Sequence, residues 1–230
     1  MELAGNLRTT FSLQRLPGEV RSNGALDEFA GLALIVSAIA YLYFDALGGA
    51  VRFVLPAMGL TMLAYSPAGI AVVALLCHFV ARIGDPESTI PMIATLAFAL
   101  VEIALSFTLG RSIGEIGFAL YIWLSFLVAL ALTQRRMHDR LIGAMVPIFF
   151  IATAGVLLNT VVRYPWVDAS YEVLGRQMVA ARDWQAYGMP RLSGFTRASY
   201  TAAAQILICY VALEHRTKPL LWRAIFWAAG

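Results

Sequence analysis

Arginine is the residue type in this chain with the clearest chemical potential, and five arginines fall within one polar stretch, residues 163–198. Of the 17 basic residues in the chain, only Lys218 is a lysine. A guanidinium group is planar, keeps its charge and binds phosphate oxygens through two parallel hydrogen bonds. The cluster therefore predicts an anion-binding site; a compositional bias toward arginine is the alternative explanation.

Two of these arginines flank a glycine just before an apolar run that begins at Ser199. A glycine allows a ligand to approach the backbone closely, and the N–H groups at the start of a helix attract anions. We therefore predict that Arg191, Gly194 and Arg197 bind an anionic substrate, with help from Arg176.

The other chemically versatile residues form no recognisable constellation. The two cysteines, Cys77 and Cys209, both lie inside apolar runs, so they indicate neither a disulfide framework nor a metal cluster. The histidines are dispersed, without the spacing of metal ligands: His78, His138 and His215. The sequence predicts no metal and no cofactor, and it leaves the catalytic residues unassigned.

The composition excludes a water-soluble enzyme. Hydrophobic residues make up 60% of the 230 residues and charged residues only 13%, whereas a soluble domain is about half apolar and a quarter charged. The apolar content corresponds to roughly seven membrane spans of about 20 residues each. The net charge of +3 is scattered between apolar runs, which excludes a nucleic-acid partner. We predict an all-α, polytopic transmembrane bundle.

The apolar runs divide the chain into four parts. Residues 1–27 are a polar cytoplasmic tail, 28–162 transmembrane helices, 163–198 a periplasmic loop, and 199–230 further transmembrane helices. The run 51–80, which holds Pro56 and Pro67, is either one long kinked helix or two short helices that turn near Ser66. The final run, 220–230, is too short to span a bilayer, so we expect the sequence to be the front part of a longer protein.

The orientation follows from the basic turns. Three arginines lie within residues 134–140, and the segment around His215 and Lys218 is similarly basic. The positive-inside rule places both turns, and the tail, in the cytoplasm. An odd number of spans must then precede residue 163, which favours counting 51–80 as one crossing, five in all.

Within the periplasmic loop, the pattern favours an amphipathic helix. Asp168 is a plausible cap, and Arg176 follows Glu172 at a spacing of four residues. Apolar residues recur at helical spacing up to Trp184, and Gly188 and Pro190 then end the pattern. We expect this helix to lie at the membrane surface; a lid that packs on the bundle without touching substrate is the alternative.

One short motif in this setting resembles a known family. Arg191, Leu192, Ser193, Gly194 and Phe195 follow a long external segment and enter a helix, which is similar to the arginine–glycine signature of the O-antigen ligase and polysaccharide polymerase superfamily. These are glycosyltransferases of the bacterial inner membrane that act on undecaprenyl-diphosphate-linked glycans. The asparagine–proline–asparagine that usually follows the phenylalanine is replaced here by residues 196–199, so the resemblance favours an exopolysaccharide polymerase over a ligase.

The resemblance implies a metal-independent transfer of a glycan from a lipid diphosphate. By this resemblance, Arg191 matches the loop arginine that contacts the lipid diphosphate, and Gly194 matches the glycine of the signature. Members use a histidine in a second periplasmic loop after further spans, and no residue of this chain takes that role. The implied partners are the lipid-linked glycan, membrane lipids and other polysaccharide-assembly proteins.

A non-enzymatic membrane protein and a second candidate residue remain as alternatives. A transporter, an assembly subunit or a lipid-diphosphate-binding partner would share the same composition without catalysing a reaction. Glu102 lies within the apolar run 90–109, and an ionisable group at that depth is a candidate functional residue; packing against a polar neighbour is the structural alternative.

Overall fold

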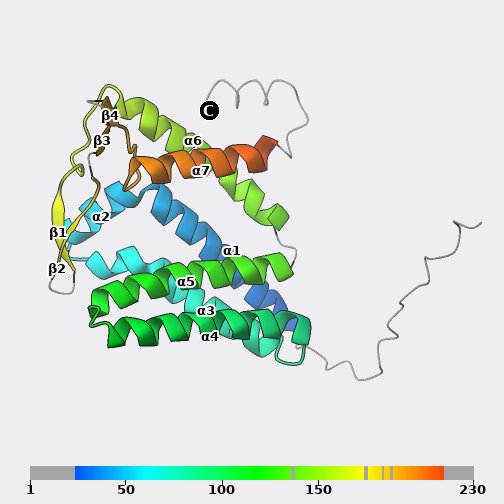
Figure 1. Cartoon of the computed structure of the whole chain (residues 1–230). Coiled ribbons are helices and arrows are strands. Elements are labelled where there is room, and N and C mark those ends of the chain that lie inside the picture. The colour runs from blue at the N-terminus through cyan, green and yellow to red at the C-terminus, as the bar shows by residue number, and fades with distance from the viewer. Residues whose placement is uncertain (1–23, 136–137, 174–175, 183, 187–188, 215–230) are drawn as a thin grey trace, which may run out of the picture.

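The computed structural model describes residues 24–135, 138–173, 176–182, 184–186 and 189–214. Helices dominate this part of the chain (Figure 1). They are α1 (Gly24–Ala46), α2 (Gly48–Ala57), the 3-10 helix η1 (Thr61–Tyr65), α3 (Ser66–Ala81), α4 (Pro86–Thr108), α5 (Ile113–Gln134), α6 (His138–Asn159) and α7 (Ser199–Glu214). Helix α1 already includes residues 24–27, which the sequence assigned to the polar tail.

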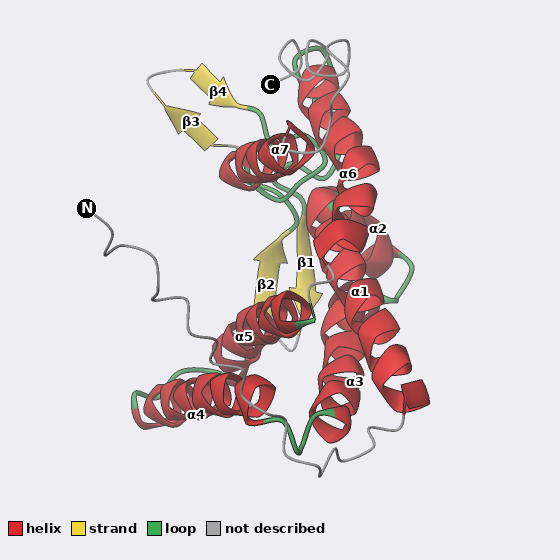
Figure 2. Cartoon of the chain, turned by 90° about the vertical axis from the view of Figure 1, so that its right-hand side faces the viewer, coloured by secondary structure: helices red, strands yellow, loops and turns green. Residues whose placement is uncertain are grey.

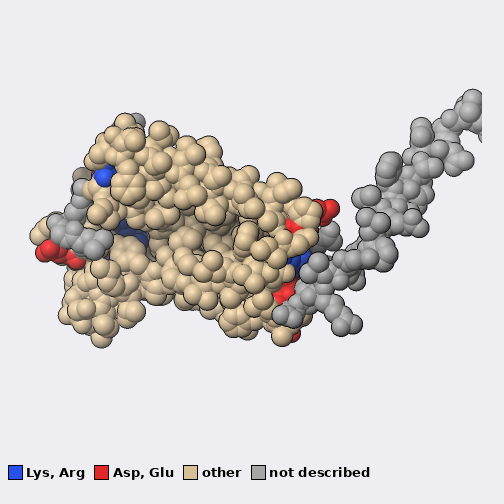
Figure 3. Space-filling view, turned by 90° about the horizontal axis from the view of Figure 1, so that it is seen from below, with Lys and Arg blue, Asp and Glu red and all other residues tan. Residues whose placement is uncertain are grey.

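The predicted all-α membrane bundle is confirmed. Five stretches are long and apolar enough to cross a bilayer: Gly24–Ala46, Thr61–Ala81, Pro86–Thr108, Ile113–Gln134 and Asp139–Asn159. All five precede residue 163, which is the count that the charge pattern favoured. Figure 3 shows charged side chains at the two ends of the visible face, with uncharged surface between them, as expected for a protein whose middle contacts lipid.

Helix α1 is the element that the two halves of the bundle share. On one side it packs against α3 and α5 around Leu34, Leu75 and Val128. On the other side, near its end at Ala46, it packs against α6 and α7. The second core is built on the fully buried side chains of Ile148 and Phe149. The oblique course of α1 between the two groups of helices is visible in Figure 1.

The ambiguous run 51–80 is broken near Gly59, whereas the two-helix alternative placed its turn near Ser66, which is the first residue of α3. Helix α2 ends at Ala57, and Gly59 has a φ of +72° in the turn that follows. This left-handed conformation favours glycine. Pro67 lies in the first turn of α3, where its missing N–H costs no helical hydrogen bond. Glycine therefore makes the break, and the proline starts the next helix.

The predicted amphipathic helix in the external segment is wrong. The structure has two antiparallel hairpins there: β1 (Ser170–Val173) pairs with β2 (Arg176–Val179), and β3 (Trp184–Ala186) pairs with β4 (Met189–Arg191). Asp168, the expected helix cap, has a φ of 61° and precedes a strand. Figure 2 shows the two hairpins well apart, and β1 packs against α2.

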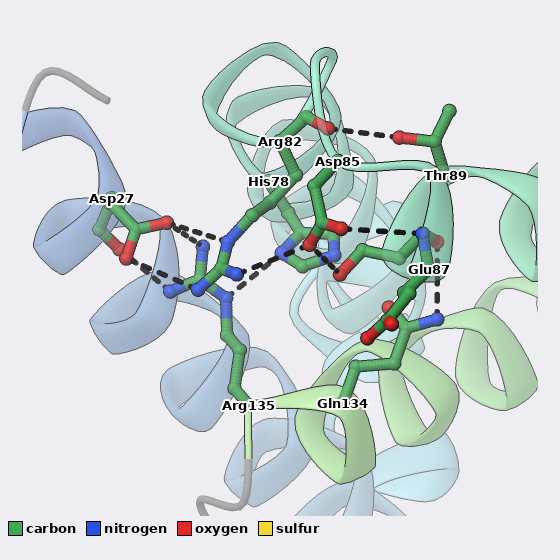
Figure 4. Close-up of polar contacts among 9 residues, drawn as sticks. Asp27, His78, Arg82, Asp85, Glu87, Thr89, Gln134 and Arg135 are labelled. Atoms are coloured by element: carbon green, nitrogen blue, oxygen red, sulfur yellow. Dashed lines mark hydrogen bonds and ion pairs between the residues drawn. The ribbon is translucent and has the colours of Figure 1, made fainter. Parts of the chain in front are cut away.

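At the end of the bundle away from the hairpins, two arginines join three helices (Figure 4). Arg82, which follows α3, and Arg135, which ends α5, both donate to Asp27 of α1, with N–O distances of 3.0 and 2.9 Å. The Arg135 side chain is only 6% exposed. Arg82 also reaches Asp85, whose carboxylate accepts from the backbone N–H of Glu87 and caps α4.

Candidate anion-binding site

A cavity of about 300 Å³ lies where the end of α6 meets the hairpin segment. The residues around it come from the chain that leaves α6, from the chain between β2 and β3, and from the end of β4 with the two residues after it. They are Asn159, Thr160, Val161, Val162, Arg163, Val167, Arg182, Arg191, Leu192 and Ser193. This lining contains three arginines and no carboxylate, so its own charge favours an anion.

The three arginines are brought together from separate parts of segment 163–198. Arg163 follows α6 and forms an exposed ion pair with Asp168, with an N–O distance of 3.0 Å. Arg182 follows the first hairpin, and its backbone N–H donates to the carbonyl of Arg197. Arg191 ends β4 and is exposed. Within the described residues, no carboxylate pairs with Arg182 or Arg191, so their guanidinium groups can bind a ligand without first breaking an ion pair.

Asn159 fixes the position of this cavity relative to the membrane helices. Its side-chain oxygen accepts from the backbone N–H of Gly194 at 3.2 Å, and its side-chain nitrogen donates to the carbonyl of Val162 at 3.1 Å. One side chain at the end of α6 therefore binds the backbone on two sides of the cavity, at Val162 and at Gly194.

The segment that follows Arg191 is held between two helices at glycine contacts. A Cβ on Gly155 of α6 would lie 2.7 Å from the ring of Phe195, and one on Gly194 would lie 2.9 Å from the backbone nitrogen of Val156. On the opposite side, a Cβ on Gly49 of α2 would lie 2.7 Å from the carbonyl oxygen of Thr196. These distances are too short for any side chain, so the segment fits only because all three positions are glycine.

Aromatic rings also pack at this contact between residues 194–196 and the helices α2 and α6, which we call the joint. Tyr164 stacks on Trp166 with a centroid distance of 4.4 Å, and both rings lie against Phe195. The Tyr164 hydroxyl donates to the carbonyl of Gly155 at 2.9 Å. Burial raises the pKa of Tyr164 above its usual value, so the hydroxyl stays protonated and keeps this bond.

The structure separates the four predicted substrate-binding residues. Arg191 lines the cavity. Gly194 is buried with a φ of 59°, and its N–H is used by Asn159, so packing and backbone conformation explain why a glycine stands there. Arg197 lies on the other side of the joint, next to Gly48 of α2. Arg176 lies in β2, with its side chain outside the described part of the structure.

Arg163, Arg182 and Asn159 were not among the predicted site residues. The two arginines belong to the cluster that the sequence singled out, but their spacing along the chain gave no reason to choose them. Asn159 is a polar residue near the end of the apolar run that was predicted to reach residue 162, and this was the only signal for it.

The described residues hold no group of three His, Cys, Asp or Glu side chains that could bind a metal. Of the dispersed histidines, His78 is fully buried at the opposite end of the bundle; the side chains of the other two lie outside the described residues. Glu102, the candidate inside the apolar run, accepts a hydrogen bond from the indole N–H of Trp123 on α5. A polar neighbour therefore accounts for this carboxylate.

Comparisons with protein-family models, with curated proteins and with solved structures find no match for this chain.

Proposed function

We propose that this protein is a membrane component of bacterial surface-polysaccharide assembly that binds an undecaprenyl-diphosphate-linked glycan at the cavity of Arg163, Arg182 and Arg191. The observation that carries the proposal is a cavity whose lining holds three arginines and no carboxylate, with Arg163 paired to Asp168 outside that lining. A diphosphate has several acceptor oxygens in one small volume, and guanidinium forks are suited to them.

The position of the cavity supports a carrier lipid over a soluble anion. It opens directly beyond Asn159, the last residue of a candidate membrane span. Exposed apolar side chains continue past that point, with Val161 79% and Val162 51% exposed. An isoprenoid chain could lie against this apolar surface while its diphosphate reaches the arginines.

The same arginines would serve a glycosyl transfer. When the bond between the glycan and the diphosphate breaks, negative charge develops on the departing oxygen, and positioned guanidinium groups stabilise it without a metal. The acceptor hydroxyl must also be positioned, and this lining offers no base for its proton. We therefore assign donor binding to this chain, in a transfer of the O-antigen polymerase and ligase type, and we assign no catalytic base to the cavity.

Binding of undecaprenyl diphosphate to the purified full chain in detergent, measured by native mass spectrometry, tests the proposal. We expect Arg191→Gln and Arg182→Gln each to weaken binding by about tenfold or more, because each removes a charge-assisted bond. Arg111→Gln is the matched control, because Arg111 is an exposed arginine in the turn between α4 and α5. Equal affinity of Arg191→Gln and the control would contradict the proposal.

A second experiment tests the reaction. In cells that carry the full-length protein, Arg191→Ala should abolish polymer formation and leave membrane insertion intact. Loss of lipid binding in detergent with unchanged polymer length and yield in cells would instead assign the cavity to a non-enzymatic subunit.

A further inference from the structure

Helix α4 lies at the edge of the bundle (Figures 1 and 2). It is the least buried of the five candidate spans, and its main contact is with α5. Its buried residues form one narrow stripe at helical spacing: Ser88, Met92 and Ala99. Large apolar side chains on the rest of the helix are exposed, among them Ile93, Leu96, Phe98, Val101 and Leu105. The outward side of α4 therefore meets either lipid or another helix.

One charged residue interrupts this apolar surface. Glu102 is exposed and lies six residues before Thr108, the last residue of α4. At 1.5 Å per residue, this position is about 9 Å inside the end of the span, within the roughly 30 Å of hydrocarbon. Ionisable residues at such depths almost always face a protein interior or a water-filled cavity, and they pair with one another. An outward-facing carboxylate therefore indicates a partner that covers it.

The bundle gives Glu102 one hydrogen bond but no opposite charge. The indole N–H of Trp123 donates to Oε2 of the carboxylate, and no lysine or arginine of the described residues pairs with it. The five candidate spans contain one such basic residue, Arg140, in the first turn of α6. Helix α6 begins at the Arg135 end of the bundle, whereas Glu102 lies in the half of α4 nearer the hairpins (Figure 1). A second copy of these five spans would therefore bring no cation to this depth.

The side chains beside Glu102 are suited to a cation. Phe98 lies one turn before Glu102, on the same side of α4. The ring centroids of Phe98 and Phe126 lie 5.7 and 6.0 Å from that of Trp123, and both phenylalanines are exposed. A cationic group that meets a carboxylate beside aromatic rings gains an ion pair and an attraction to the ring faces. These four residues, Phe98, Glu102, Trp123 and Phe126, form a surface that we call the Glu102 face.

We propose that the Glu102 face binds a transmembrane helix of another protein, whose lysine or arginine side chain pairs with Glu102 within the hydrocarbon. The aliphatic stem of such a side chain can lie against the exposed apolar residues of α4 while its charged end meets the carboxylate. None of the four residues lines the Arg191 cavity, so this partner does not depend on the function proposed there.

Synthetic transmembrane peptides test this partner. Two leucine–alanine helices of about 23 residues differ at one position, six residues from one end, which holds lysine in one peptide and leucine in the other. Each peptide carries a fluorescent donor. The full chain carries the acceptor at Leu109→Cys, directly after α4, with Cys77 and Cys209 replaced by alanine. Energy transfer in phosphatidylcholine vesicles reports binding. We expect the lysine peptide to bind about tenfold or more tightly than the leucine peptide, because only lysine neutralises Glu102.

The Glu102→Gln variant identifies the group responsible. A glutamine oxygen can still accept the indole N–H of Trp123, so this variant removes the charge and keeps the local hydrogen bond. It should bind the two peptides equally. Glu87→Gln is the matched control, because Glu87 is an exposed carboxylate in the first turn of the same helix. Its preference for the lysine peptide should equal that of the wild type.

Equal binding of the two peptides by the wild type, or a lysine preference that survives in Glu102→Gln, would overturn the inference. Self-association is measured in the same vesicles, with donor and acceptor on separate copies of the chain. Energy transfer between copies that is lost in Glu102→Gln would assign this face to a second copy, and it would also overturn the inference.

Discussion

Arg135 donates from Nε to Nδ1 of His78 across 2.8 Å, and this bond joins the end of α5 to the last turn of α3. The same guanidinium reaches the backbone carbonyl of Asp27 at 2.8 Å and its carboxylate at 2.9 Å. One nearly buried side chain therefore connects three helices at this end of the bundle.

Replacing Arg135 should destabilise the whole bundle. Arg135→Gln removes a buried cation and leaves Nδ1 of His78 and the backbone carbonyl of Asp27 without this donor, while the Asp27 carboxylate keeps only Arg82. Such a change costs about 3 kcal/mol. The thermal melting midpoint of the full chain in detergent measures this effect. Arg140→Gln is the matched control, because Arg140 is exposed at the start of α6. Equal melting midpoints for the two variants would show that the network contributes little.

The contact between α6 and Phe195 predicts opposite effects for two glycine substitutions in the same helix. Gly155→Ala should lower the melting midpoint, because its Cβ would lie 2.9 Å from the backbone nitrogen of Phe195, and such overpacking costs about 1–3 kcal/mol. Gly143→Ala should leave it unchanged or raise it, because no atom lies within 4 Å of the added Cβ and alanine favours a helix. The idea fails if both variants behave alike.

The turn between α3 and α4 should make stability sensitive to acid. The Ser88 hydroxyl donates to Asp85 at 2.7 Å and is the largest cause that lowers the pKa of that carboxyl from 3.8. Because the folded pKa is the lower one, the stabilisation is complete above 3.8 and is lost as the pH falls through the folded pKa.

Ser88→Ala should therefore destabilise the protein at neutral pH and lose less stability than the wild type on acidification to about pH 3. Melting curves at the two pH values give the comparison. Glu87→Gln keeps the backbone N–H that donates to Asp85, so its acid sensitivity should match the wild type. A loss in Ser88→Ala as large as that of the wild type would exclude this role of the hydroxyl.

The arrangement of the spans predicts where labels react. With Cys77 and Cys209 replaced by alanine, a cysteine at Glu28 and one at Gln185 should react with membrane-impermeant reagents from opposite sides. Both positions are exposed; Glu28 lies in the second turn of the first candidate span, Gly24–Ala46, and Gln185 follows the fifth, Asp139–Asn159. The positive-inside rule expects position 28 to react from the cytoplasm. Labelling of both positions from the same side of sealed membranes would contradict the five-span arrangement.

Long apolar runs made most of the bundle predictable. Helices α4 and α5 begin at recognisable caps, Asp85 and the reciprocal pair of Ser112 and Glu115, and their length follows from bilayer thickness. The break in the run 51–80 was harder to place, because two prolines and two glycines, Gly59 and Gly69, compete as its cause. A proline in a first turn and a proline in a helix interior have the same sequence signature but opposite consequences.

The external segment could not be predicted in the same way. Its strands have only three or four residues, too few for a period of two to be distinguished from a helical period. The hairpins, not the sequence spacing, bring Arg163, Arg182 and Arg191 to one cavity and place Arg197 elsewhere. Residue type alone therefore predicted an arginine site. Which arginines form that site is determined by the tertiary contacts.

The clamped backbone at residues 194–196 mechanically couples two helices that are distant in sequence. Gly49 of α2 touches one side of this short stretch and Gly155 of α6 the other, so neither helix can slide or tilt without dragging the strand end that bears Arg191. Because α2 also packs against β1, a displacement of that helix would move the first hairpin as well as the end of β4 that lines the Arg191 cavity.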